Sequence, residues 1–214
     1  MIKTGRLETM TPGRENHREQ LLGGARKCLR EKGYARTTSR DIAAASKSNL
    51  GSIGYHFGSK ETLLNEAIRE GCAEWTDQLG RLAFADAGAT PTERLRASWA
   101  ALADTFEEQR PLLVAFVEAL AQTERSEELR LQLAELYEES RAAVGRMVAA
   151  SLGEAEIGEG HTRAVASFLI AVCEGLLLQR LVDPHRAPSG EELIAGLEAA
   201  LPIALGQRST TAVD

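Results

Sequence analysis

The polar side chains with the most specific spacing in this sequence lie between residues 37 and 64. Asn49, Ser52 and His56 recur at helical spacing, so in a helix they share one face. Hydroxyl, amide and imidazole groups on a helix face can hydrogen-bond to base edges in the major groove of DNA. Arg, Lys and Tyr side chains around them can contact phosphates. The chemistry expected here is therefore non-covalent recognition of double-stranded DNA, without a reacting group.

An apolar stripe occupies the other side of the same predicted helix, residues 49–57. It contains Leu50, Ile53 and Phe57, which we expect to face a hydrophobic core. A helix that separates polar from apolar residues in this way lies at a protein surface, and the elements beneath it determine its position.

A short helix is predicted directly before this segment, at residues 39–45, followed by a break at 46–48. Either Thr37 or Thr38 can cap the start of this helix, and Asp41 lies near its first turn. A short helix, a tight turn and a second short helix with a polar outer face form the helix-turn-helix pattern.

Longer helices are expected on both sides of this pattern. Residues 14–32 carry apolar side chains at helical spacing, and Gly33 is suited to end that helix. Ser59 is expected to cap a helix over residues 59–79, whose apolar face contains Leu63, Leu64, Ala67 and Ile68.

The remaining sequence also shows helical periodicity and no strand pattern. Helices are predicted at 91–108, 111–122, 126–151, 161–182 and 189–205. We therefore predict an all-α protein of about nine helices, with an N-terminal three-helix helix-turn-helix domain and a larger C-terminal helical bundle. The expected division is 1–60 for the DNA-binding domain, with 1–13 as a flexible arm, and 61–214 for a ligand-sensing and dimerisation domain.

The charge of the chain is divided unevenly. Its 214 residues carry a net charge of −6. Residues 1–60 contain 12 Lys and Arg against 5 Asp and Glu, a net charge of +7, whereas residues 61–214 contain 13 against 26, a net charge of −13. A basic N-terminal part on an acidic body indicates a polyanionic partner for the N-terminal part alone.

Several classes of protein are not supported by the sequence. Catalytic and nucleotide-binding motifs are missing, and the four histidines are scattered, so we expect no enzyme activity, no catalytic residues, no metal and no other cofactor. The three widely spaced cysteines are typical of a reducing cytoplasm. The longest apolar run, 164–173, is shorter than the roughly 18 residues of a membrane span. A cytoplasmic protein without a membrane partner is expected.

The segment TTSRDIAAASKSNLGSIGYHFGSKETLL, residues 37–64, resembles the DNA-binding domain of the tetracycline-repressor-like (TetR) transcriptional regulators. The positions that match the pattern of this family are Thr38, Asp41-Ile42-Ala43, Tyr55-His56-Phe57 and Ser59-Lys60-Glu61. Two positions depart from it: Lys47 stands where the family usually has a glycine of left-handed geometry, and Ser48 stands where it usually has an inward valine. A non-glycine residue at positive φ costs about 1 kcal/mol, which a phosphate contact by Lys47 can offset.

The resemblance implies a set of DNA contacts. Thr38, Tyr55 and Lys60 are expected at phosphates, and Asn49 and Ser52 at base edges, while His56 continues the same face towards the DNA backbone. The full set expected to contact DNA is Thr38, Arg40, Lys47, Ser48, Asn49, Ser52, Tyr55, His56 and Lys60. For each of them the alternative is a capping residue or a solvated helix face.

The last two helices are expected to form the interface of a homodimer. They carry more apolar residues than solvent exposure favours, and two such helices from each subunit form a four-helix interface. The predicted interface residues are Phe168, Leu169, Val172, Leu176, Leu177, Leu193, Ile194, Leu197 and Leu201, with core packing as the alternative.

The resemblance also implies a small-molecule cavity among the middle helices. Its predicted lining is Trp99, Phe106, Phe116, Glu118, Tyr137 and Phe168. Glu118 interrupts an apolar run, and a buried carboxylate is costly unless it is paired, so it could face a cationic ligand. A pair with Arg141 or exposure to solvent is the alternative.

The sequence therefore predicts a sequence-specific repressor that leaves a palindromic operator when an unknown small molecule binds its C-terminal domain. Two other readings stay open at this point. One is a ligand-independent regulator or an activator of the same family. The other is a helical interaction protein that does not bind specific DNA sequences.

Overall fold

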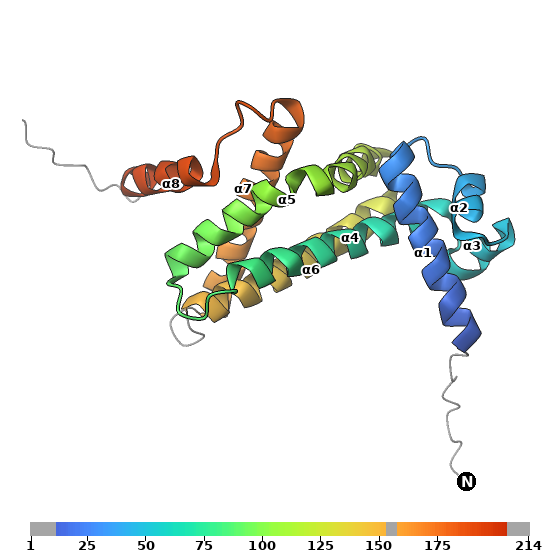
Figure 1. The fold of residues 1–214 in the computed structure, drawn as a ribbon, viewed down its shortest axis with the longest axis horizontal. Coiled ribbons are helices and arrows are strands. Elements are labelled where there is room, and N and C mark those ends of the chain that lie inside the picture. Colours follow the sequence, from blue (N-terminus) through green and yellow to red (C-terminus); the bar gives the residue numbers. More distant parts are fainter. Residues whose placement is uncertain (1–11, 153–157, 205–214) are drawn as a thin grey trace, which may run out of the picture. The chain divides into compact units, whose positions relative to one another are not determined.

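A computed structural model of the chain describes residues 12–152 and 158–204, and these residues form only helices and connecting segments (Figure 1). The predicted all-α class is confirmed. The α-helices are α1 (Pro12–Lys32), α2 (Ser39–Ser46), α3 (Leu50–Phe57), α4 (Lys60–Ala83), α5 (Pro91–Leu120), α6 (Glu127–Leu152), α7 (Glu159–Val182) and α8 (Gly190–Ala204). A 3-10 turn, Thr123–Arg125, connects α5 to α6.

One boundary between helices was predicted wrongly. The sequence indicates separate helices at 91–108 and 111–122, but α5 is continuous and contains Pro111, so the described residues form eight α-helices. A proline inside a helix removes one backbone hydrogen bond and costs about 3 kcal/mol. Buried residues on both sides of Pro111, including Phe106 and Ala115, offset this cost by burial.

The predicted flexible arm, residues 1–13, lies outside the described residues except at its end. Pro12 and Gly13 belong to the first turn of α1. A proline suits this position because its fixed φ is already helical and its missing N–H has no partner in a first turn.

The described helices are distributed over two compact units. The first unit contains residues 1–72 and 111–136, and the second contains residues 73–110 and 137–214. Helices α4, α5 and α6 each contribute residues to both units. The division into 1–60 and 61–214 concerns roles rather than packing, and it stays a prediction.

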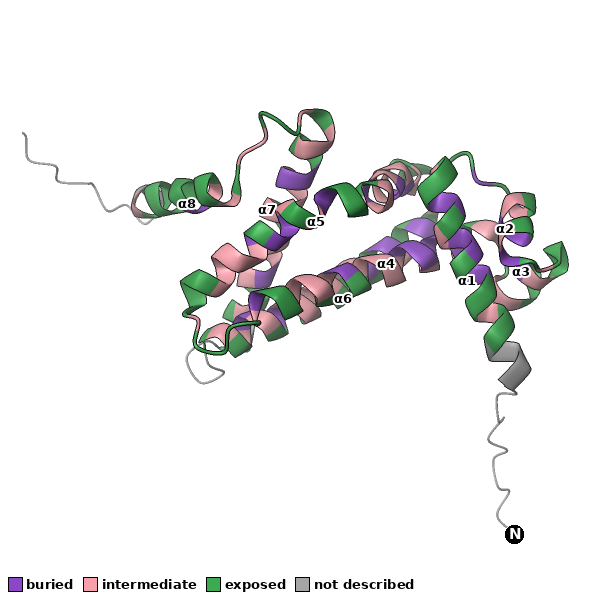
Figure 2. Ribbon diagram, viewed as in Figure 1, coloured by how far each residue is buried: buried purple, intermediate pink, exposed green. Residues whose placement is uncertain are grey.

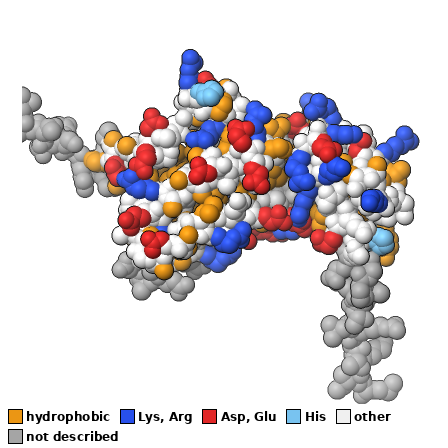
Figure 3. All heavy atoms as spheres, viewed as in Figure 1, with side chains coloured by type: hydrophobic (Ala, Val, Ile, Leu, Met, Phe, Trp, Pro, Cys, Tyr) orange, Lys and Arg blue, Asp and Glu red, His pale blue; other side chains and the backbone are white. Residues whose placement is uncertain are grey.

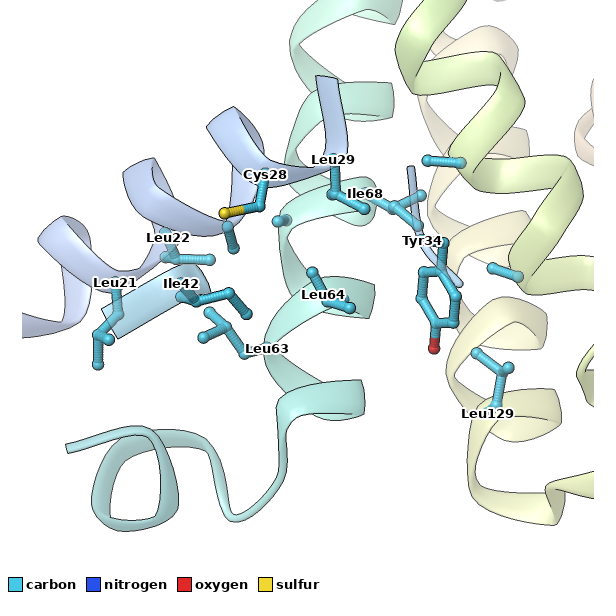
Figure 4. Packing of buried hydrophobic residues seen from close by; sticks show 14 of the residues in the cluster. Leu21, Leu22, Cys28, Leu29, Tyr34, Ile42, Leu63, Leu64, Ile68 and Leu129 are labelled. Atoms are coloured by element: carbon cyan, nitrogen blue, oxygen red, sulfur yellow. The ribbon is translucent and has the colours of Figure 1, made fainter. Parts of the chain in front are cut away.

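The first unit is built around one hydrophobic core (Figure 4). Leu21, Leu22, Cys28 and Leu29 of α1 meet Ile42 of α2, Ile53 of α3, and Leu63, Leu64 and Ile68 of α4. The ends of α5 and α6 complete this core with Ala115, Ala119, Leu129, Leu133 and Leu136. The helix-turn-helix segment is therefore held by pieces of helices from later in the chain.

Two adjacent glycines in α1 have opposite environments. Gly24 is buried against α2, where an added Cβ would lie 2.8 Å from Cβ of Ser46 and 3.0 Å from the carbonyl oxygen of Ile42. Gly23 is exposed, and an added Cβ would meet no atom within 4 Å. Gly24 thus permits the close approach of α1 to α2, whereas packing requires nothing of Gly23.

We predict that Gly24→Ala destabilises the protein by about 1–3 kcal/mol, because the contact atoms in α2 belong partly to backbone and cannot move aside. Gly23→Ala should instead stabilise it by up to about 1 kcal/mol, because alanine is the better helix former. Urea unfolding of both variants measures the difference. Equal effects of the two substitutions would show that α1 and α2 do not meet at Gly24.

The second unit is joined by polar and aromatic contacts between its helices. The indole N–H of Trp75 in α4 donates to the hydroxyl of Thr105 in α5 over 2.9 Å. Arg163 of α7 pairs with Glu138 of α6 at 2.7 Å. An added Cβ on Gly190, at the start of α8, would lie 2.6 Å from Cβ of Trp99. The start of α8 therefore packs directly against α5.

Helix α7 is the one helix of the described residues that is both long and apolar enough to cross a membrane. Within Gly160–Val182, its most apolar 18-residue stretch has a mean hydropathy of 1.8, so the helix meets this requirement by length and composition only. From the sequence we expected no membrane span, because the uninterrupted apolar run 164–173 is too short. That run ends at Glu174, but further apolar residues follow it in the same helix. Only 11% of the most apolar stretch is buried within the chain. An apolar surface of this size calls for a further covering partner.

Candidate DNA-binding site

The start of α2 is a complete capping box. Thr38 adopts an extended conformation, its hydroxyl accepts from the N–H of Asp41, and the Asp41 carboxylate accepts from the N–H of Thr38. The neighbouring Thr37 is buried and donates its hydroxyl to the carbonyl of Gly33 over 2.6 Å. Thr38 is therefore the cap, and Thr37 belongs to the loop between α1 and α2.

Asp41 is also paired with Lys32 of α1. The hydrogen bond from Lys32 holds the pKa of the Asp41 carboxyl well below its ordinary value, and the bonds from Thr38 act in the same direction. The same hydrogen bond raises the pKa of Lys32. Both groups are charged at neutral pH, so the cap and its link to α1 are formed under physiological conditions.

The turn between α2 and α3 has the left-handed geometry that its position in the motif predicts. Lys47 has φ 56° and ψ 31°, and it is the one non-glycine residue of positive φ among the described residues. Its N–H bonds to the carbonyl of Ala44, and the N–H of Ser48 bonds to the carbonyl of Ala43 over 3.0 Å. This is a Schellman ending of α2, formed here with a lysine in place of the usual glycine.

Asn49 caps the start of α3. Its side-chain oxygen accepts from the N–H of Ser52 over 2.9 Å and from the Ser52 hydroxyl over 3.1 Å. The two residues predicted at base edges are thus brought together, and their mutual contact uses the oxygen of Asn49. The amide Nδ2 of Asn49 is the group that it can offer to an acceptor on a base.

The outer face of α3 differs from the predicted one at Leu50. The sequence pattern places Leu50 with Ile53 and Phe57 in the core, but Leu50 is 49% exposed while Ile53 is buried. At 100° per residue, Leu50 lies about 60° around the helix from Ile53, at the edge of the stripe. Within the stripe, Ile53 is buried, Phe57 is half-buried and Leu50 is left exposed.

Tyr55 is the most exposed aromatic residue of α3, with 66% of its surface exposed. Its ring meets the His56 ring edge to face, with centroids 5.0 Å apart. On the inner side, the Arg18 guanidinium of α1 lies over the Phe57 ring at 5.1 Å. The C-terminal end of α3 is therefore held from α1, while Tyr55 points to solvent.

Lys60 has a structural contact that the sequence did not reveal. Its ammonium group donates to the carbonyl of Thr37 over 2.9 Å and lies 3.2 Å from Glu61. This contact joins the start of α4 to the start of α2. Arg40 and Lys47, by contrast, are exposed. In the view of Figure 3, Lys and Arg side chains gather over the surface formed by α1–α3.

An ion-pair network fastens α1 to α4, and the sequence reading missed it. Arg18 lies 3.0 Å from Glu66, and Arg26 pairs with Glu70. Hydrogen bonds from Arg69 and then Arg18 lower the pKa of Glu66 against the opposing effect of burial. The sequence shows opposite charges along both helices. It does not show that α1 packs against α4, and without that knowledge the pairs cannot be predicted.

Residues of α5 and α6 also contact the helix-turn-helix segment. The carboxylate of Glu118 accepts from the N–H of Ala35, in the loop between α1 and α2, over 3.0 Å. Thr62 donates to Glu128 of α6 over 3.1 Å. The two helices therefore hold the loop before α2 and the start of α4 through polar contacts.

A buried chain of side chains adds to these contacts. The Tyr34 hydroxyl donates to Asn65 over 2.9 Å, and the Asn65 amide donates to Gln132 of α6. Burial raises the pKa of Tyr34 to about 12, so its hydroxyl is protonated and remains a donor at neutral pH. These neutral hydrogen bonds connect the loop after α1, α4 and α6 without placing a charge in the core.

The six residues predicted to line a ligand cavity do not form one group. Phe116 packs against the core of the first unit, and Glu118 bonds to Ala35 in the same unit. Trp99, Phe106, Tyr137 and Phe168 belong to the second unit. Trp99 and Phe106 are buried in α5, whereas Phe168 lies exposed on α7. A ligand role for these residues stays a prediction.

Glu174 in the second unit is half-buried among aromatic and charged groups. Burial raises the pKa of its carboxyl, against the opposing effects of a hydrogen bond with Tyr137 and the charge of Arg141. Arg141 in turn lies over the Tyr137 ring at 5.7 Å and 3.1 Å from Glu138. Glu174 therefore interacts with two residues of α6, through the hydrogen bond with Tyr137 and the charge of Arg141.

The predicted interface residues of α7 and α8 fall into two groups. Leu176, Leu177 and Ile194 are buried within the single chain. Phe168, Leu197 and Leu201 are exposed, and Leu169, Val172 and Leu193 are intermediate. Most of α8 is exposed (Figure 2). Two further exposed apolar residues of α7, Leu178 and Val182, were not predicted.

The three-helix unit with its exposed α3 defines a helix-turn-helix DNA-binding protein, and the comparisons with known proteins agree with this class. Residues 21–67 match the family described as "Bacterial regulatory proteins, tetR family". Residues 91–205, more than half of the chain, match "BetI-type transcriptional repressor, C-terminal". The chain belongs to the TetR family and carries a BetI-type C-terminal domain. It is a DNA-binding transcriptional repressor with a ligand-responsive C-terminal domain, and not an enzyme.

Individual relatives are similar over most of their length. The HTH-type transcriptional repressor DhaR of Mycobacterium sp. (strain GP1) is 26% identical over 186 residues, which cover 86% of this chain and 92% of DhaR. A solved structure from Pseudomonas aeruginosa PAO1 has a TM-score of 0.65 at 21% identity, covering 94% of this chain and 95% of that one. A structure from Saccharomonospora viridis in complex with choline has a TM-score of 0.61 at 19% identity, covering 87% and 96%.

We predict opposite effects of Lys47→Gly on stability and on DNA binding. Relief of the left-handed strain should stabilise the protein by about 1 kcal/mol. Loss of one phosphate contact should weaken binding to the operator and lower the salt slope of log K by about 0.9 for each protomer. Thermal unfolding and titrations at several salt concentrations measure the two effects.

Lys27→Ala is a suitable control for this variant, because Lys27 is an exposed lysine of α1 that pairs with Glu31. It should leave the salt slope unchanged. An unchanged slope in Lys47→Gly as well would show that Lys47 makes no phosphate contact.

Proposed function

We propose that the protein binds a palindromic operator as a homodimer in the cytoplasm and leaves it when a small molecule binds to residues 61–214. In this proposal residues 1–60 contact the DNA and α3 is the recognition helix. The observation that carries it is the exposed face of α3, which lies on the core of the first unit through Ile53 and Phe57.

The electrostatics of the N-terminal part support the DNA contacts. Its net charge of +7 supplies the phosphate attraction that underlies all DNA binding. Arg40 is exposed at the start of α2, Lys47 in the turn that precedes α3, and Tyr55 near the C-terminal end of α3. Phosphate contacts at both ends would hold the helix in the groove while Asn49 and Ser52 read bases.

The need for a dimer follows from the size of one such unit. A single helix-turn-helix module makes few contacts, and specific regulators pair two of them about 34 Å apart on one face of the DNA. The two recognition helices then read the same sequence in opposite directions, which accounts for a palindromic operator.

A line of exposed apolar and small residues on α7, which we call the α7 seam, supports the proposal that a second copy of this chain packs against that helix. Phe168, Ala171, Gly175, Leu178 and Val182 are spaced alternately by three and four residues and therefore lie along one line of the helix. All five are exposed or half-exposed. The small residues Ala171 and Gly175 in the middle would let a partner helix approach closely. On α8, Leu197 and Leu201 are exposed one turn apart and extend the apolar surface.

The route by which a ligand would act is supported by the helices that both units share. A small molecule that displaces α4, α5 or α6 in the second unit would disturb the contacts of Glu118, Glu128 and Gln132 with the helix-turn-helix segment. We propose that this changes the spacing of the two recognition helices, so that they no longer match both half-sites.

The DNA-binding proposal is tested by footprinting the protein on its own promoter region, together with the variant Tyr55→Ala plus Lys60→Ala. We expect a palindromic footprint that the double variant loses, because it removes two phosphate contacts and the link between α4 and α2. Tyr55→Ala alone should lower affinity without lowering the melting temperature, since Tyr55 is exposed. Binding without a footprint, equally strong in the variants, would favour a helical interaction protein that does not recognise specific DNA.

The dimer proposal is tested with Leu178→Glu, which places a charge in the middle of the α7 seam. We expect a monomer by light scattering and a loss of operator affinity of at least tenfold, because the two half-sites are then bound separately. Leu131→Glu is the matched control, since Leu131 lies on α6 and is 55% exposed, close to the 49% of Leu178. A dimer that persists in Leu178→Glu at micromolar concentration would contradict the seam.

A further inference from the structure

Beside its polar residues, the outer face of α3 carries two large side chains and two glycines. Leu50 and Tyr55 are exposed, and Gly51 and Gly54 between them are exposed as well. Leu50 and Gly54 are one turn apart, and so are Gly51 and Tyr55, which places all four on neighbouring columns of the helix. Leu50 is therefore the one large apolar side chain that α3 presents outwards.

No contact among the described residues requires the glycine at position 54. An added Cβ there would meet no atom within 4 Å, unlike the tight site at Gly24. Its φ is not positive, since Gly33 and Gly58 are the described glycines of positive φ. Glycine inside a helix is less stable than alanine, so Gly54 weakens α3 without a benefit to packing. Unlike Gly23, Gly54 lies on the exposed face of α3, where the lack of a Cβ lets the backbone approach another molecule closely.

Leu50 is placed where a recognition helix meets base edges. It is the first residue of α3, next to the cap Asn49, and the N-terminal residues of such a helix reach deepest into the major groove. A leucine side chain has no donor or acceptor, so it cannot read the hydrogen-bonding groups of a base. The apolar feature that the major groove offers is the methyl group of thymine.

We propose that Leu50 recognises a thymine methyl group in each operator half-site, and that Gly54 lets the backbone of α3 lie close enough to the base pairs for this contact. The inference rests on the proposed role of α3 as the recognition helix. It names Leu50 as a specificity-determining residue, although its residue type had suggested the core.

Uracil substitution tests the contact, because deoxyuridine differs from thymidine only by the missing methyl group. Operator duplexes carrying deoxyuridine at one thymine position at a time are titrated with the wild-type protein and with Leu50→Ala. We expect one position in each half-site at which wild type loses about fourfold in affinity, the effect of one buried methyl group. Leu50→Ala should bind the unmodified operator about sixteenfold more weakly, because both protomers lose the contact, and it should show no further loss at that position.

Gly54→Ala tests the close approach, with Gly23→Ala as the matched control. Both glycines are exposed within helices and have open space around a new Cβ. Both variants should therefore melt at a higher temperature than wild type. Operator affinity should fall at least tenfold in Gly54→Ala and stay unchanged in Gly23→Ala, since only Gly54 lies on the face of α3.

The outcomes separate this inference from the function on which it rests. If wild type shows no preference for its operator, the proposed function fails. If wild type binds its operator but Leu50→Ala responds to each uracil as wild type does, the thymine contact is refuted and the function stands. If Gly54→Ala binds the operator as tightly as wild type, the close approach is refuted.

Discussion

The first turns of α4 are the support on which the helix-turn-helix unit depends. Leu63, Leu64 and Ile68 are wholly enclosed there by α1 and by residues of α2, α5 and α6. Each such side chain stabilises the fold by about 1.5–3 kcal/mol relative to exposure, whereas a surface ion pair contributes about 0–1 kcal/mol. Helices α2 and α3 have eight residues each, and isolated helices of that length are not stable in water. They keep their positions because they lie on this core.

Polar contacts then determine the orientation of the parts around that core. The cap at Thr38, the bond from Lys60 to the Thr37 carbonyl and the bond from Ala35 to Glu118 all act on the loop before α2 or on its first turn. Each replaces hydrogen bonds to water, so its net contribution is small, but breaking one leaves a polar group without its partner. Such contacts contribute little to stability and much to geometry. They would suit the release mechanism that we propose, in which the placement of α3 changes without unfolding.

The sequence predicted the helix-turn-helix segment closely because its signals are local. Thr38 and Asp41 cap α2, and Gly33 ends α1, through contacts with residues only a few positions away. The left-handed geometry at Lys47 follows from its place between two short helices. The continuity of α5 was harder to predict, because Pro111 is a local stop signal that burial on both sides overrides. Leu50 was assigned to the core from its spacing, but the width of the apolar surface beneath α3 depends on α1, α2 and α4 together. The contact of Glu118 with Ala35 spans 83 residues of sequence and that of Lys60 with Thr37 spans 23, so no local sequence pattern predicts them.

By itself the sequence determined the all-α class, the place of the recognition helix, the basic N-terminal part and the family of the protein. These follow from periodicity, capping residues, charge and a motif without gaps, all of which act over short distances along the chain. Only the tertiary structure decided which side of each helix is covered. It therefore decided which polar groups are contacts within the protein and which residues, such as Leu50, Gly54 and those of the α7 seam, remain at the surface. The physical reason is that burial is a property of the packed surfaces of several helices, and it is set only when distant segments meet.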